Sequence, residues 1–110
     1  MNLEHRKLAT GQWKQLSFLK QMANIGSEVR RALNWKSKGN AEYCHKATNR
    51  ILELLSLTLD NITIASHYKE LARLKEAVVD HFYGENKFSS SDGFWRKYFD
   101  HFVYASRMNH

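Results

Sequence analysis

The apolar residues of this chain recur at steps of three and four residues, which is the spacing of one face of an α-helix. They do so in four segments, and the expected helices span residues 11–36, 41–60, 67–83 and 92–107. The sequence has no proline and only five glycines, so little interrupts these segments. Short connections favour antiparallel packing of successive helices. The sequence therefore predicts an all-α fold, a four-helix up-and-down bundle.

Residue types at the segment ends support these boundaries. Thr10 and Asn40 are suitable N-caps for the first two helices, since their side-chain oxygens can accept from free backbone N–H groups. Gly39 suits the left-handed position that follows a helix. Ser89 and Asp92 stand at the spacing of a capping box before the fourth helix.

The composition predicts one globular domain, residues 1–110. An apolar fraction of 43% disfavours disorder, and a chain of 110 residues can bury about two-thirds of its surface. The single cysteine, Cys44, cannot form an internal disulfide, and we expect it to be a small buried group. The N-terminus lacks the apolar run of a signal peptide, and no uncharged apolar stretch approaches 18 residues. We therefore expect a cytoplasmic protein that does not span a membrane.

The positive charge of the chain is concentrated in its first third. The net charge is +6, and residues 1–38 carry all of this excess, whereas residues 39–110 contain equal numbers of basic and acidic side chains. A basic segment is typical of a solubility face or of a contact with an acidic subunit. It also suits an anionic partner, so nucleic-acid binding through the basic N-terminal helix is an alternative.

Two features favour contact with another chain. Leu52, Leu57 and Leu59 widen the apolar stripe of the segment 41–60, so this helix is either central or has a second face against another chain. Trp13 and Trp35 project away from the apolar face of the first segment, and exposed tryptophans often mark protein contacts. The leading prediction is a self-associating interaction module without catalytic activity, a homo-oligomer that also accepts a protein partner.

Aromatic residues concentrate near the C-terminus. Nine of the 14 lie between Phe82 and Tyr104, and their helical spacing predicts a packed core rather than a ring-lined pocket. Tyr104 lies opposite the stripe that contains Trp95 and Phe102, so we expect it to be exposed.

The histidines do not form a metal-binding pattern. A helical metal pair needs a spacing of three or four residues, and the six histidines offer none. There is no Glu-x-x-His pair and no phosphate-binding glycine motif. The sequence thus predicts no metal and no cofactor.

Two basic residues fall on predicted core faces. Arg30 interrupts the apolar face of the first segment, and Lys75 interrupts that of the third. A buried charge must be paired or must extend to solvent. The expected partners are Asp80, Glu53 and Glu76. The alternatives are a structural ion pair, an inter-subunit contact, or a small basic pocket in which Arg30 and Lys75 bind phosphate or carboxylate. Gly26, on the same face as Arg30, would permit close helix approach or leave space for a ligand.

The run from Arg96 to His101 resembles the Arg-x(4–6)-His signature of HEPN-domain ribonucleases. Those are small all-helical proteins that place the Arg and His at a dimer interface and cut RNA without metal. The resemblance implies that Arg96 and His101 act in metal-independent RNA cleavage. Lys97 stands where that family usually has a polar residue of another kind, and the side chains of Arg96 and His101 point more than a quarter turn apart on an ideal helix.

A second resemblance covers most of the chain. Residues 23–32, 80–88 and 97–105 are similar to a family of small prokaryotic helical proteins with no assigned activity. That resemblance implies a helical fold and a prokaryotic source, and it implies no function.

Overall fold

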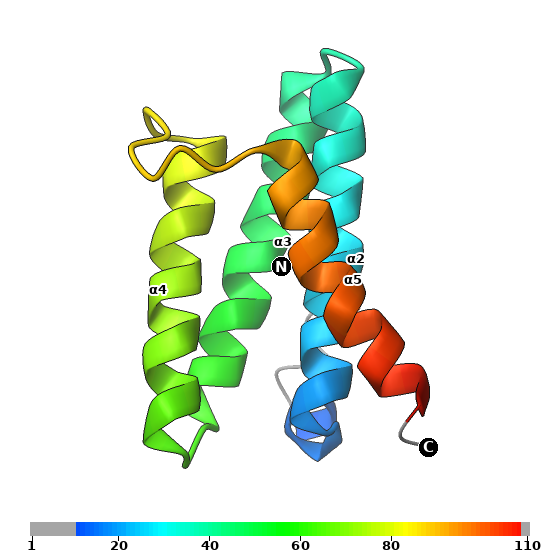
Figure 1. Cartoon of the computed structure of the whole chain (residues 1–110), viewed down its shortest axis with the longest axis vertical. Helices are drawn as coiled ribbons and strands as arrows, with labels where there is room; N and C mark the ends of the chain where they lie inside the picture. The colour runs from blue at the N-terminus through cyan, green and yellow to red at the C-terminus, as the bar shows by residue number, and fades with distance from the viewer. Residues whose placement is uncertain (1–10, 109–110) are drawn as a thin grey trace.

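The computed structural model describes residues 11–108 and confirms the all-α four-helix fold. The helices are α2 (Phe18–Ser37), α3 (Ala41–Asp60), α4 (Ala65–Phe82) and α5 (Asp92–Met108), and a short 3-10 turn, η2 (Trp13–Gln15), precedes them. They run alternately up and down (Figure 1), as expected. The described residues contain no strand.

The first helix begins later than the sequence analysis predicted. Thr10, the expected N-cap, lies outside the described residues. The chain is extended at Leu16, with ψ 146°, and α2 starts only at Phe18. Ser17 is the N-cap, because its Oγ accepts from the backbone N–H of Lys20 at 3.2 Å. A serine with a strong capping preference thus divides the expected first segment into η2 and α2.

The turn between α2 and α3 follows the expected chemistry. Gly39 has φ +74°, and its N–H donates to Lys36 O while the next N–H, of Asn40, donates to Trp35 O. This is the Schellman pattern, which closes a helix C-terminus with a left-handed residue. The Asn40 side chain then accepts from the N–H of Tyr43 at 3.0 Å and caps α3.

The last two helices differ slightly from expectation at their starts. α4 begins at Ala65, two residues before the predicted start. At α5 the N-cap is Ser91, whose Oγ accepts from the N–H of Phe94 at 3.0 Å. The expected Ser89/Asp92 pair does not form, because Ser89 lies in a left-handed turn with φ 54° and Asp92 contacts Lys36 instead.

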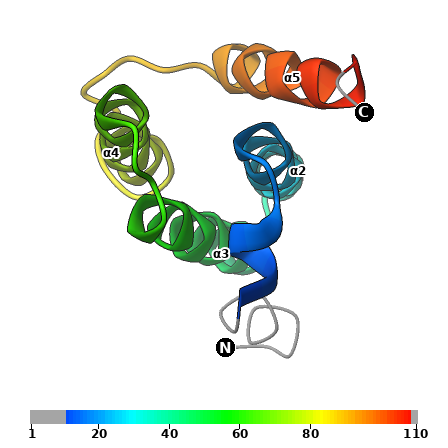
Figure 2. The same ribbon diagram turned by 90° about the horizontal axis from the view of Figure 1, so that it is seen from below.

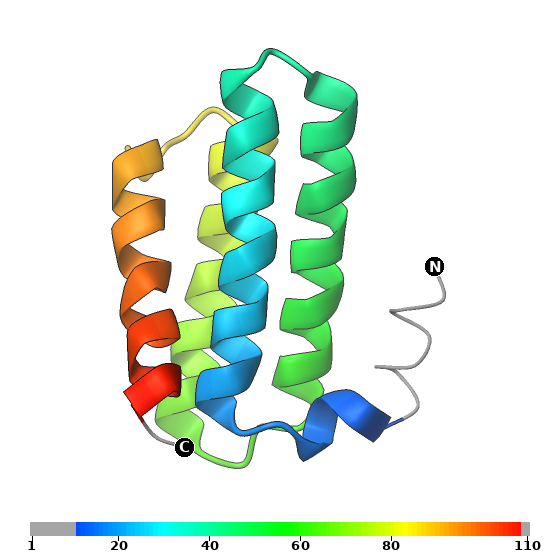
Figure 3. The same ribbon diagram turned by 90° about the vertical axis from the view of Figure 1, so that its right-hand side faces the viewer.

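The helices are arranged as an open arc. Seen from below, their order is α5, α2, α3, α4 (Figure 2). α2 packs against both α3 and α5, and α3 packs against both α2 and α4, as Figure 3 also shows for α2. Of the successive pairs, α4 and α5 pack least closely, and they contact each other through side chains such as Glu70 and Tyr98. The connection 83–91 is long enough to cross the end of the bundle and to place α5 on α2 (Figure 1).

Side chains from all four helices form the core. Val29, Leu33, Ile51, Leu55 and Leu71 are almost completely buried. The additional leucines of α3, which are Leu52, Leu57 and Leu59, are partly buried against this core. The wide apolar stripe of α3 therefore reflects its central position, which was one of the two alternatives.

Trp13 is buried, contrary to expectation. Its side chain is 2% exposed, and its Nε1 donates to Thr58 Oγ1 at 2.9 Å. Gln21 Nε2 donates to the backbone oxygen of Trp13 at 2.9 Å. The break at Leu16 turns η2 toward α3, so the face extrapolated from α2 does not apply to Trp13. Trp35 is half-buried, with its ring edge-on to that of Tyr43 at 4.8 Å between centroids.

None of the helices in residues 11–108 combines the length and apolar character that a membrane crossing requires.

Candidate functional site

Residues of α4 and α5 line an apolar groove. Figure 2 shows these two helices at the ends of the arc. The cavity of the groove has a volume of about 420 Å³, within the range of ligand-binding pockets. Leu74 and Ala77 of α4 line it, together with Phe94, Trp95 and Tyr98 of α5. The helical repeat explains this lining, since residues three or four apart share one face of each helix.

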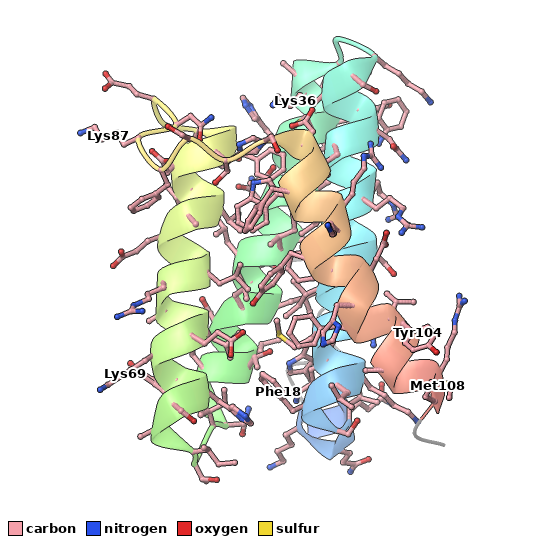
Figure 4. The ribbon with its side chains drawn as sticks, viewed as in Figure 1. Phe18, Lys36, Lys69, Lys87, Tyr104 and Met108 are labelled. Atoms are coloured by element: carbon pink, nitrogen blue, oxygen red, sulfur yellow. The ribbon has the colours of Figure 1, made fainter. Side chains whose placement is uncertain are left out.

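Polar contacts hold the two walls of this groove in place. The hydroxyl of Tyr98 donates to Glu70 Oε1 at 2.8 Å, across the groove. Burial, and then the neighbouring Glu70 carboxylate, raises the pKa of the Tyr98 hydroxyl, so it remains a donor. The side chains of Lys69 and Arg73 lie along the α4 rim, and Figure 4 shows Lys69 projecting outward from α4. The groove thus has an apolar floor and a polar rim.

Phe94 is the exposed aromatic ring of the groove. It is 52% exposed and stacks on Tyr98 at 6.0 Å between centroids. Trp95 and Phe99, in contrast, are buried, so the expected aromatic core is confirmed for these two rings, whereas Tyr83 and Phe88 are exposed like Phe94. Tyr104 is 67% exposed, as expected, and Figure 4 shows it near the C-terminal end of α5.

A second, smaller pocket lies on the other side of α5, between α5 and α2. Its volume is about 170 Å³, and Arg30, Arg96 and Arg107 line it together with Asp100. Gly26 forms part of it, and a Cβ added there would lie 2.9 Å from the Cβ of Phe99. Glycine at this position therefore permits the close approach of α2 and α5, as the sequence suggested.

Arg30 and Lys75 do not share a pocket. Arg30 forms an ion pair with Asp100, and both side chains are 56% exposed. The partner of Arg30 is therefore none of the three acids proposed from the sequence, because α5 rather than α4 packs beside this face of α2. Lys75 donates to Ser56 Oγ at 3.2 Å, on the opposite side of the bundle core, and does not line the α2–α5 pocket.

Arg96 and His101 have different surroundings. Arg96 lines the α2–α5 pocket, and its guanidinium donates to Asn34 Oδ1 at 3.0 Å. His101 is exposed, with its ring edge-on to Phe102 at 5.7 Å, and it does not line the pocket. A role for this pair in RNA cleavage stays a prediction from the resemblance.

A third cluster, at the start of α5, was not predicted. Asp92 accepts from Lys36 Nζ at 3.0 Å and lies 3.0 Å from His81 Nε2, and Figure 4 shows Lys36 beside the first turn of α5. Burial alone would raise the pKa of the Asp92 carboxyl, but the contacts with Lys36 and His81 outweigh it and lower that pKa.

Cys44 is buried, as expected. Burial, only partly offset by the hydrogen bond with Thr48, raises the pKa of its thiol. A neutral, buried thiol is a poor nucleophile, so the chemistry of this residue favours packing. Within residues 11–108, no three side chains of the histidine, cysteine or acidic types come together in a group suited to a metal ion.

No protein-family model, curated protein or solved structure matches this chain.

Proposed function

We propose that this protein is a non-catalytic interaction module that forms a homodimer through the α4–α5 groove. The observation that carries the proposal is the groove itself, an apolar surface between α4 and α5 that includes the exposed ring of Phe94. An exposed apolar surface of this kind, rimmed by polar residues, typically marks a protein contact. Trp13 is buried and cannot contact a second chain, so the proposal of self-association rests on the groove.

The charges of α4 favour a second copy of the chain as the occupant. Arg73 lines the groove, and Glu76 lies three residues further along α4, next to the lining of the groove rather than within it. Both side chains are exposed, and neither makes an ion pair with another described residue. Two copies of α4 that run antiparallel across a two-fold axis place each Arg73 beside Glu76 of the second copy. This pattern is self-complementary, as an isologous dimer requires.

The apolar part of the interface follows from the same symmetry. Phe94 protrudes beside the groove, and a two-fold axis brings the ring from each copy toward the opening of the other. Burial of apolar area at about 25 cal/mol per Å² drives association, while the charged pairs fix the register. We place this dimer in the cytoplasm, where the free thiol of Cys44 would stay reduced.

A charge exchange tests the proposal. Arg73→Glu places two acidic side chains, the new Glu and Glu76 of the second copy, beside each other at both symmetry-related contacts. Glu76→Arg places two arginines beside each other at the same two contacts. We expect each single variant to dimerise about tenfold more weakly, because each loses two pairs and gains two repulsions of up to about 1 kcal/mol. The double variant restores opposite charges and regains the dimer.

Sedimentation velocity on the three variants and the original protein measures the dimer fraction. A double variant that stays as weak as the single ones would contradict this arrangement, as would single variants that dimerise normally. Circular dichroism controls for folding, because both residues are exposed and their exchange leaves the core unchanged.

A further inference from the structure

The pocket between α2 and α5 contains more positive charge than its carboxylate can balance. Arg30, Arg96 and Arg107 line it, and Asp100 is the acidic residue among its lining. Asp100 pairs with Arg30. Two guanidinium groups thus share this pocket without an anionic partner among residues 11–108.

The contacts of these two arginines leave donors free. Arg96 donates to the uncharged amide of Asn34, which does not neutralise it. Arg107 makes no hydrogen bond or ion pair with the part of the chain that the structure describes. A guanidinium carries five N–H donors in a planar fork, which suits the oxygens of a phosphate.

The size of the pocket limits the ligand. A volume of about 170 Å³ holds several waters of about 30 Å³ each but lies below the 300–1,000 Å³ or so of sites for drug-sized molecules. Gly26 and Phe99 form part of the pocket where the two helices approach closely. The pocket therefore accommodates one compact anionic group rather than a large organic ligand.

We propose that this pocket binds the phosphate group of a phosphate monoester. A monoester carries a charge of about −1.5 to −2 near neutral pH, which matches the two uncompensated guanidinium groups. A phosphodiester carries a single negative charge, so it balances this pocket less well. Paired hydrogen bonds from arginine to phosphate oxygens supply affinity and orientation. The site lies on the opposite side of α5 from the α4–α5 groove and does not depend on dimerisation.

A pair of matched probes tests the ligand class. Methyl phosphate is a monoester, and dimethyl phosphate is the corresponding diester. Isothermal titration calorimetry should show saturable binding of methyl phosphate and at least about tenfold weaker binding of dimethyl phosphate. Binding of methyl phosphate should weaken from about pH 7.5 to about pH 5, because the second pKa of the phosphate is about 6.

The same titrations separate a small phosphate from a nucleic-acid backbone. A single-stranded RNA without terminal phosphates should not displace methyl phosphate. Displacement by this RNA, or equal binding of the two methyl esters, would overturn the proposal, and so would a lack of saturable binding by methyl phosphate.

Three variants identify the pocket as the site. Arg107→Gln should weaken methyl phosphate binding about tenfold or more without changing the fold, since Arg107 has no partner among the described residues. Lys97→Gln removes the same charge from α5 outside the pocket and should change affinity less than about twofold. Asp100→Asn removes the competing carboxylate and should strengthen binding. Equal effects of the first two variants, or weaker binding by Asp100→Asn, would contradict this site.

Discussion

Gly26 determines how closely α2 and α5 approach each other. In Gly26→Ala the new Cβ would meet the Phe99 Cβ at 2.9 Å, and Phe99 is buried and cannot move freely. Overpacking of this kind costs about 1–3 kcal/mol, which exceeds the helix-propensity gain of up to about 1 kcal/mol. Urea denaturation should show a lower free energy of unfolding for this variant.

Gly93→Ala is the matched control for this comparison. Gly93 is also helical, but the nearest atom to an added Cβ is the Ser91 Oγ at 3.9 Å. This variant gains helix propensity without a clash, so it should unfold at the same or a higher urea concentration. Equal destabilisation of both variants would show that Gly26 has no special packing role.

The burial of Trp13, which the sequence did not predict, can be tested by substitution. Trp13→Ala removes a buried ring and its hydrogen bond to Thr58, and we expect a loss of about 3–5 kcal/mol in unfolding free energy. Tyr104→Ala, at a side chain that is 67% exposed, should change it by less than about 0.5 kcal/mol. Similar melting temperatures for the two variants would place Trp13 at the surface after all.

The two aromatic residues also show where periodicity is a valid guide. Tyr104 lies within an uninterrupted helix, so its position on the helical wheel predicts its exposure correctly. Trp13 precedes a break in the helix, and the extended residue Leu16 changes the direction of the chain. A helical wheel is informative within one helix and carries no information across such a break.

The start of α5 depends on the ionised form of Asp92. The hydrogen bonds from Lys36 and His81 lower the pKa of this carboxyl despite the opposing effect of burial. A lowered pKa in the folded state means that Asp92 stabilises the fold above its unfolded pKa and that this stabilisation is lost as pH falls through the lowered value. We expect urea stability to decrease as the pH falls below the ordinary value of 3.8.

Asp92→Asn separates this contribution from that of the other carboxylates. The variant should be less stable than the original protein at neutral pH and should lose less stability on acidification. Denaturation curves at neutral and acidic pH measure the difference. Identical pH profiles for the two proteins would show that Asp92 does not contribute.

Helix boundaries and helix packing differ in how far the sequence determines them. Gly39 and Asn40 act through bonds to residues within one or two turns, so their roles follow from the local sequence. The placement of α5 on α2 depends on contacts such as that of Lys36 with Asp92, 56 residues apart. No local pattern in the connection 83–91 indicates this crossing, so the sequence did not indicate that α5 packs mainly on α2.

For the candidate sites too, the sequence indicates which face of a helix a residue occupies but not which other helix packs on that face. Periodicity correctly placed Gly26 at a close approach of two helices, but it placed Arg30 on the core face of α2, whereas the Arg30 side chain is 56% exposed beside α5. It could not show that α5 is the covering helix, so the Arg30–Asp100 pair and the arginine pocket went unrecognised. The α4–α5 groove was also not predictable, since it depends on how α5 is placed relative to α2 and α4.

Self-association through that groove is the central claim, and the mass of the original protein in solution tests it most directly. Sedimentation equilibrium at tens of micromolar should give twice the chain mass of 13.0 kDa. A mass of 13.0 kDa throughout that range would contradict the claim.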